Sequence, residues 1–162
     1  PANTNPIFTG DLVTLSGGFV QEATGAGTTE DTFTTVGIFW GCRYVDADGS
    51  YVYANQWNGG AGRSNIQAYV VGPSGATFIV EGDPAGGYTA ADVGTRKGVI
   101  YGAGNTATGS SGTTLGAAGA NVAGAALRVV QLLDIPEITD PTKQYLEVSV
   151  VNSQMFGTDA AP

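Results

Sequence analysis

Residues with strongly reactive side chains are few in this sequence. Its 162 residues include no histidine and a single cysteine, Cys42. Without histidine, Ser-His-Asp triads, Cys-His pairs and His-ligated zinc sites are excluded. Cys42 lies among aromatic strand-forming residues with no lysine nearby in the sequence. We therefore interpret it as a small core residue rather than a nucleophile, and no intrachain disulfide is possible.

Pairs of acidic residues are the remaining candidates for catalysis. Glycosidases use two carboxylates at a fixed separation, and the candidates here are Glu22 with Glu30 and Asp31, or Asp83 with Asp92. The sequence alone brings no two of them to that separation, and acids in surface turns are far commoner. We expect no enzymatic activity and no catalytic residues, with a carboxylate-dependent hydrolase as an alternative.

Two short motifs resemble ligand-binding loops but each lacks a required feature. The Asp-Ala-Asp-Gly run at residues 46–49 begins like a calcium loop, yet Trp57 occupies the position of the bidentate acid. We expect a hairpin turn there. Residues 102–107 begin like a dinucleotide fingerprint, with Ala107 at the third glycine position, but the residues that follow would break the required helix. We expect a structural loop, and neither a metal nor a cofactor.

A few aromatic and basic residues are candidates for binding. Tyr51, Tyr53 and Trp57 would stack on a sugar or anchor a protein partner if they share a strand face, while the alternative is that they fill the core or cap a barrel end. Arg96 and Lys97 are the only adjacent basic pair. They pair with a partner's acids or lie in a solvated turn.

The charge balance disfavours two classes of partner. Six Lys and Arg against 14 Asp and Glu give a net charge of −8, which repels nucleic acids and anionic lipid headgroups. No stretch approaches the roughly 20 apolar residues of a membrane span, and the first residues do not resemble a signal peptide. Only 12% of residues are charged. Neutral polar groups therefore cover much of the surface, which favours coverage by neighbouring subunits.

Several segments have the pattern of strands. In residues 144–152, Leu146, Val148 and Val150 point to one face. Residues 127–133 carry apolar residues at both parities, which predicts a strand covered on both faces. Further strands are expected at residues 11–15, 32–44, 51–53, 66–71 and 77–81, with a hairpin turn at Asp48 and Gly49 between the second and third of these.

These segments predict an all-β fold, a small barrel or sandwich of short strands. At most one short helix is expected, at residues 89–93, where Thr89 and Asp92 have the spacing of a capping box and Gly94 ends the turn. Residues 102–126 are a long segment of mostly Gly, Ala, Ser, Thr and Asn with little to bury. We expect one domain over residues 1–162, with residues 1–10 as an N-terminal arm.

Five blocks occur in an order that resembles a family of small virion proteins of tailed bacteriophages, the head decoration or cement proteins. The blocks are residues 10–15, 90–94, 101–112, 127–133 and 147–152. The resemblance covers most of the chain and depends on the order of the blocks, since each motif alone carries little information. Two segments after the fourth block, residues 134–138 and 153–156, depart from the family pattern.

The resemblance implies a β-rich domain on the outside of the head that binds the major capsid protein and links its subunits, as a homotrimer. The candidate contact residues are Ile7, Phe8, Tyr51, Tyr53, Trp57, Arg96 and Lys97. We expect the segment around Ile7 and Phe8, and the segment that begins at residue 102, to become ordered on assembly. The alternative is a carbohydrate-binding module on a virion or cell surface that uses Tyr51, Tyr53 and Trp57. A major shell protein is disfavoured because the chain is short and lacks a long helix.

Overall fold

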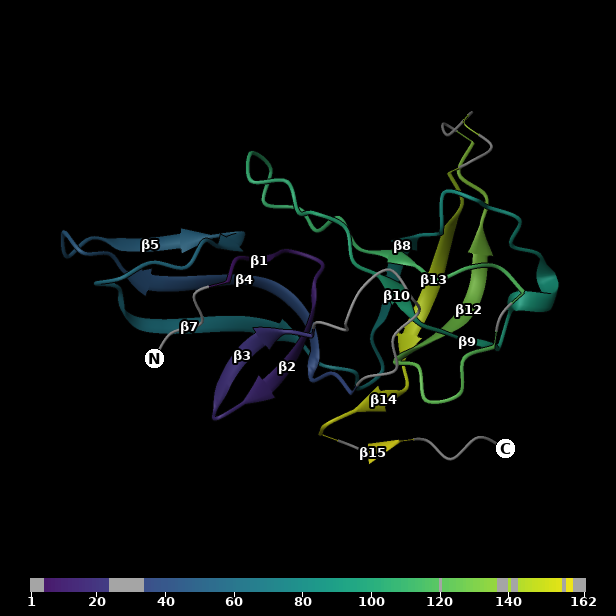
Figure 1. Cartoon of the computed structure of the whole chain (residues 1–162), viewed down its shortest axis with the longest axis horizontal. Helices are drawn as coiled ribbons and strands as arrows, with labels where there is room; N and C mark the ends of the chain where they lie inside the picture. Colours follow the sequence, from purple (N-terminus) through teal and green to yellow (C-terminus); the bar gives the residue numbers. More distant parts are fainter. Residues whose placement is uncertain are drawn as a thin grey trace.

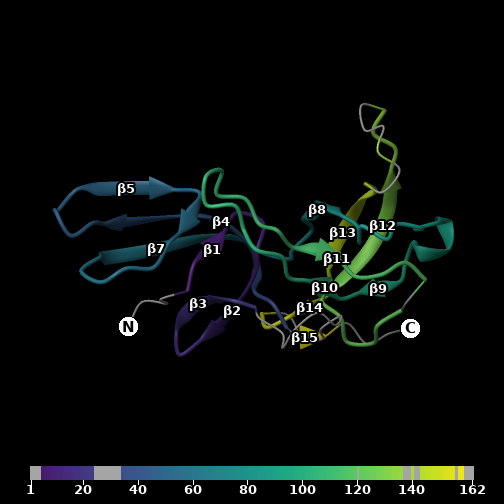
Figure 2. The same cartoon turned by 45° about the horizontal axis from the view of Figure 1, so that its top comes forward.

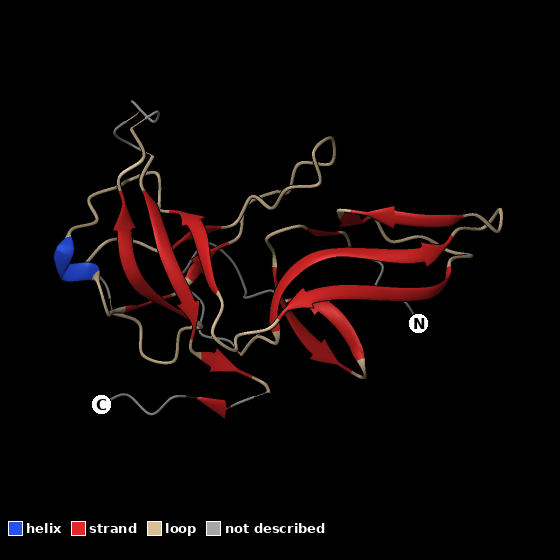
Figure 3. Ribbon diagram, turned by 180° about the vertical axis from the view of Figure 1, so that it is seen from behind, coloured by secondary structure: helices blue, strands red, loops and turns tan. Residues whose placement is uncertain are grey.

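The structure is a computed structural model that describes residues 5–23, 34–119, 121–136, 140, 143–155 and 157–158. The chain is all-β, as predicted, and consists of antiparallel sheets that do not close into a barrel (Figures 1 and 3). Over the described residues, the helical element is the 3₁₀ turn η1 (Ala90–Asp92). Asp92 Oδ2 accepts a hydrogen bond of 2.9 Å from the amide of Thr89, which confirms the predicted helix start.

The larger sheet has five strands, with β4 at its centre. Its strands are β2 (Leu12–Ser16), β3 (Phe19–Glu22), β4 (Gly37–Val45), β5 (Tyr51–Ala54) and β7 (Ser64–Val71). The predicted hairpin is present between β4 and β5, where Gly49 has a φ of 88°. This conformation is available to glycine without a Cβ clash, so the turn forms at the predicted dipeptide.

The second sheet has the order β8-β13-β12-β9 and lies beside the first along the long axis of the molecule (Figures 1 and 2). Its strands are β8 (Thr77–Glu81), β13 (Tyr145–Val150), β12 (Leu127–Leu133) and β9 (Arg96–Lys97). Among the described residues there are also three two-stranded sheets: β1 (Ile7–Phe8) with β6 (Gln56–Trp57), β10 (Val99–Ile100) with β11 (Thr114–Leu115), and β14 (Asn152–Ser153) with β15 (Gly157–Thr158).

Two clusters of apolar side chains form the core. One lies under the five-stranded sheet and consists of Ile7, Val13, Val36, Phe39, Cys42, Tyr44 and Trp57. The other covers one face of the four-stranded sheet, where the alternating residues Leu146, Val148 and Val150 are buried as predicted. Leu12 and Ile38 from the first sheet also belong to this second cluster, so it joins the two sheets. That residues 1–162 fold as one domain stays a prediction.

The strand over residues 127–133 is confirmed, but the prediction that both of its faces are covered is wrong. Leu127 and Val129 are buried, whereas Val130 is exposed. A bulge between Val129 and Gln131 shifts the register with β13. Val130 follows the buried Val129, so its side chain points to the opposite face of the strand, and that face is exposed here.

Candidate functional site

Ile7, Phe8 and Trp57 are core residues of this chain. Ile7 pairs with Trp57 across β1 and β6, and all three side chains are buried. The Trp57 ring packs edge-to-face on Tyr44, with centroids 5.4 Å apart, and the Arg63 guanidinium lies 5.4 Å from the Trp57 centroid. This burial corrects the prediction that Trp57 joins Tyr51 and Tyr53 on one binding surface. It also differs from the expectation that an N-terminal arm around Ile7 and Phe8 becomes ordered on assembly.

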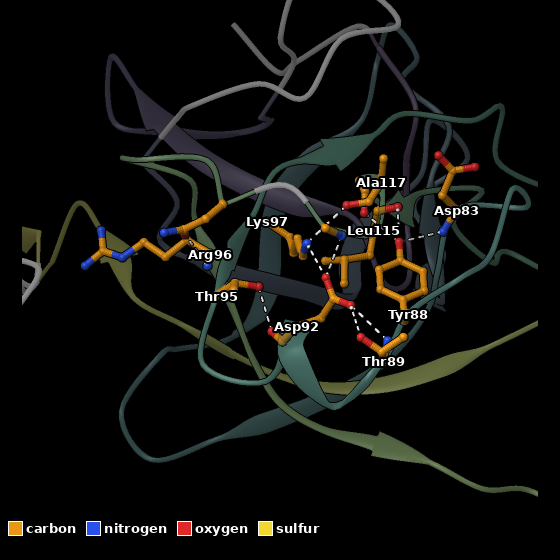
Figure 4. Close-up of polar contacts among 12 residues, drawn as sticks. Asp83, Tyr88, Thr89, Asp92, Thr95, Arg96, Lys97, Leu115 and Ala117 are labelled. Carbon is orange, nitrogen blue, oxygen red and sulfur yellow. Dashed lines mark hydrogen bonds and ion pairs between the residues drawn. The ribbon is translucent and has the colours of Figure 1, made fainter.

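Arg96 and Lys97 are also buried. This corrects the prediction that they lie in a solvated turn or contact a partner. Lys97 Nζ donates to Asp92 Oδ1 at 2.9 Å and to the carbonyl of Ala117 at 3.1 Å, as Figure 4 shows. The backbone amide of Arg96 donates to Asn121 Oδ1 at 2.9 Å. Through these contacts of Arg96 and Lys97, β9 is joined to the segment that follows β11.

Asp92 is the acidic member of this buried cluster, and it also accepts a hydrogen bond of 2.6 Å from the amide of Gly119. Burial alone would raise the pKa of Asp92, but the hydrogen bonds from Lys97, Thr89 and Gly119 together with the charge of Lys97 lower it to about 2. The Tyr88 hydroxyl lies nearby and donates to the carbonyl of Gly116 at 2.5 Å. The cluster is a fully hydrogen-bonded anchor of η1.

The acids considered for a hydrolase have separate local roles. Asp83 accepts a hydrogen bond of 2.8 Å from the amide of Ala85 in its own turn, while Asp92 is held by Lys97. Glu30 and Asp31 lie outside the described residues. The structure therefore assigns Asp83 and Asp92 to structural contacts.

Asp11 and Glu22 are two interacting carboxylates, of which the sequence analysis considered Glu22, with other partners, and did not consider Asp11. Asp11 is buried, and its Oδ2 accepts a hydrogen bond of 2.7 Å from the amide of Phe8. Burial raises the pKa of Asp11 against the lowering effect of hydrogen bonds from Ser111 and Phe8. Burial, together with the charge of Asp11, also raises the pKa of Glu22. Nothing in the local sequence around Asp11 distinguishes it from an ordinary turn acid.

The first of the two motifs is a hairpin turn and the second is a loop, as predicted. In the run at residues 46–49, the amide of Gly49 donates to the carbonyl of Asp46 at 2.9 Å, which closes the hairpin. Within the part of the chain that the structure describes, no group of three or more Asp, Glu or Cys side chains could hold a metal ion. The loop at residues 102–112 is anchored on Thr9, whose amide donates to the carbonyl of Gly109 at 2.9 Å. This loop is therefore held by the chain itself.

Cys42 is a core residue, as predicted. It is buried under the five-stranded sheet, and burial raises the pKa of its thiol to about 11. It lies at a cavity of about 330 Å³ together with Ile7, Phe39, Trp57 and Ala68, and the part-exposed Phe19 and Ile66 also line it. At neutral pH this thiol is protonated and unreactive.

A second, larger hollow lies between the two sheets, and we call it the inter-sheet groove. It has a volume of about 430 Å³, and its lining includes Leu12, Ile38, Phe78, Val80, Leu127 and Val148. Trp40 from β4 and Ile79 from β8 also line it and are 65% and 67% exposed. Two large apolar side chains thus project into solvent beside an apolar hollow, an arrangement typical of protein contact sites.

Sequence reasoning did not select Trp40, although a signal for its exposure is present. The register of β4 with β7 shifts between Phe39 and Gly41, which leaves Trp40 as the extra residue of a bulge. A glycine inside a strand pattern indicates a bulge or a close backbone approach. A Cβ at Gly41 would lie 2.9 Å from the carbonyl oxygen of Ala54, so the approach is close here.

Tyr51 and Tyr53 are exposed, as a binding role requires, with 78% and 69% of their surface accessible. Tyr53 on β5 is paired with Arg43 on the neighbouring strand β4, and Arg43 Nε donates a hydrogen bond to Gln67 Oε1 at 2.7 Å. Tyr69 on β7 is also exposed. Two of the three predicted aromatic residues, Tyr51 and Tyr53, are therefore exposed. Trp57 is buried, and Tyr69 is an exposed aromatic residue that was not predicted.

The described residues contain no helix with the length and hydrophobicity of a membrane-spanning segment. Comparisons with protein-family models, with curated proteins and with solved structures find no match to this chain.

Proposed function

We propose that this chain is a bacteriophage capsid decoration protein that acts by adhesion and carries out no chemical reaction. In this proposal it binds the major capsid protein on the exterior of the head and links neighbouring subunits. The order of the five sequence blocks supports this class of protein. The observation that carries the proposal is the inter-sheet groove, with Trp40 and Ile79 exposed beside it.

The inter-sheet groove suits a protein partner for two reasons. Large, fixed apolar side chains at a hollow are the residues that commonly dominate the free energy of protein association. None of the residues that line the groove is charged, so its coverage removes no lining charge from water. A contact made by Trp40 and Ile79 would therefore depend weakly on salt.

A homotrimer on the shell would multiply these contacts. Each copy would bind through its own groove, and simultaneous contacts raise the overall affinity without new chemistry. Native mass spectrometry of the free protein tests the trimer separately from head binding. A single monomer mass at micromolar concentration would remove the trimer from the proposal and leave the adhesive role standing.

The adhesive role is tested by co-sedimentation of the purified protein with phage heads prepared without it. Trp40→Ala and Ile79→Ser should each weaken uptake at least about tenfold, because each removes a central apolar anchor. Met155→Ser is the matched control, since Met155 is 63% exposed but does not line the groove. Wild-type uptake by Trp40→Ala and Ile79→Ser would contradict the assignment of this groove.

A further inference from the structure

A row of polar and aromatic side chains crosses the outer face of the five-stranded sheet. Tyr53 on β5 is paired with Arg43 on β4, which is paired in turn with Gln67 on β7. Directly paired residues in antiparallel strands share a face. Residues two apart on one strand do so as well, so Tyr51 and Tyr69 lie on this face too. We call these five residues the tyrosine face.

The three rings of the tyrosine face are held by strands and exposed to solvent. Tyr51, Tyr53 and Tyr69 are 78%, 69% and 43% exposed. The Cα atoms of Tyr51 and Tyr53 are about 7 Å apart, the two-residue repeat of a strand. The strands fix where these side chains start, and a tyrosine has only two χ angles, so binding through them loses little conformational entropy.

Two features make the tyrosine face more than an apolar patch. Arg43 and Gln67 are already joined at 2.7 Å, so a planar group with several N–H donors stands beside the rings. Within the described part of the chain, the hydroxyls of Tyr51, Tyr53 and Tyr69 have no hydrogen-bond partner. The face therefore combines flat aromatic surfaces with unused donors and acceptors.

We propose that the tyrosine face binds a carbohydrate chain. The face of an aromatic ring is electronegative and attracts the C–H groups on the flat side of a pyranose. The sugar hydroxyls would at the same time find partners in Arg43, Gln67 and the phenol groups. A net charge of −8 opposes nucleic acids, which also stack on aromatic rings. An apolar protein surface would cover Arg43 and the phenols without satisfying them, which is unfavourable.

This inference goes beyond the proposed adhesive role, because it uses a different set of residues. The inter-sheet groove includes Trp40 and Ile79, whereas no member of the tyrosine face lines it. A decoration protein bound through the groove would keep a second surface for glycans. The two activities are therefore separable by mutation.

The test is binding of the purified full-length protein to a glycan array of cello-, chito- and xylo-oligosaccharides and bacterial O-antigen saccharides. The best oligosaccharide is then titrated by calorimetry. Tyr53→Ala should weaken that binding at least about tenfold, whereas Tyr53→Phe should stay within about threefold because it keeps the stacking surface. Arg43→Ala should also weaken it, since it removes the planar donors.

The controls separate this proposal from a change in folding and from head binding. Met155→Ser should bind the oligosaccharide like the wild type, because Met155 is exposed elsewhere. Tyr53→Ala should keep the wild-type unfolding midpoint and the wild-type uptake by heads. Absence of wild-type binding to the array would overturn the proposal, as would wild-type titration curves for both Tyr53→Ala and Arg43→Ala.

Discussion

Lys97 is a cation whose side chain has no exposed surface. A buried ammonium is stable only if an acid and further acceptors replace the water it has lost, and here Asp92 and the carbonyl of Ala117 do so. This explains why a pair that looks like a surface contact in the sequence is internal. The sequence does place Asp92 and Lys97 five residues apart, but that spacing does not reveal burial.

Loss of one member of this pair should be strongly destabilising. Lys97→Met should lower the free energy of unfolding by about 3 to 5 kcal/mol, because it leaves the Asp92 carboxylate buried without its partner. Urea denaturation measures the change. The double variant Asp92→Asn/Lys97→Met should lose less unfolding free energy than the sum of the losses in Asp92→Asn and Lys97→Met, since the two side chains interact.

Lys143 provides the matched control for Lys97. Its ammonium lies 3.5 Å from Glu81, but 49% of its side chain is exposed. Lys143→Met should therefore change stability by less than about 1 kcal/mol. Equal losses for Lys97→Met and Lys143→Met would show that the buried pair has no special role.

Stability should respond to acid through Asp92. Its pKa is about 2 in the folded chain against an ordinary value of 3.8, so the folded state favours the ionised form. This contribution is fully present above the ordinary value and is lost as pH falls through about 2. Unfolding free energies measured from neutral pH down to this range should show the decline, and Asp92→Asn should remove that part of it.

Asp11 should have the opposite effect on how stability depends on pH. Burial raises its pKa above 3.8, so the folded state favours the protonated form, and its contribution to stability decreases as pH rises through the raised pKa. Asp11→Asn keeps an acceptor for the amide of Phe8 and should reduce this decrease. The same denaturation series checks it, and an unchanged slope at mildly acidic pH would contradict the assignment.

At the scale of elements, the loop at residues 102–112 depends on a close approach to β1. A Cβ at Gly104 would overlap the ring of Phe8, and Gly72 is a glycine with open space around it. Gly104→Ala should therefore cost about 1 to 3 kcal/mol and expose the loop, whereas Gly72→Ala should have little effect. Hydrogen exchange at the amides of Thr9 and Ser111 reports the release. Unchanged protection in Gly104→Ala would show that the contact does not hold the loop.

The sequence predicts those elements whose pattern is local. The strand at Thr77–Glu81 and the hairpin at Asp48 and Gly49 follow from β-branched and aromatic runs bounded by turn residues. The hairpin between β2 and β3 is not among the predicted elements, although Gly17 and Gly18 lie between its strands with positive φ. Two adjacent glycines are an established hairpin signal, so the sequence contains enough information to predict this hairpin.

The candidate site was less predictable because its exposure depends on pairing between distant segments. Ile7 and Trp57 bury each other although 50 positions separate them, and no local pattern indicates that contact. Trp40 is exposed because a bulge interrupts the alternation of β4. For Tyr51 and Tyr53, which alternate on a short strand after a recognisable turn, the sequence leaves a surface position and a core position open, and both side chains are exposed.

At the scale of the molecule, two sheets share a core and leave two separate surfaces for contact. Leu12 and Ile38 connect the five-stranded sheet to the core of the other sheet, and the inter-sheet groove lies at this junction. The tyrosine face belongs to the five-stranded sheet alone. In the proposed function, the protein acts by adhesion, with the inter-sheet groove toward the shell and the tyrosine face free.

The adhesive role has one decisive test, which is uptake of the wild-type protein by phage heads prepared without it, measured across a salt series from about 0.05 to 1 M. For a protein that adheres through the groove, we expect uptake that saturates at a fixed number of copies per head and persists at high salt, because the groove is apolar. Failure to sediment with the heads at any salt concentration would contradict it, and so would uptake that vanishes as salt screens the charges.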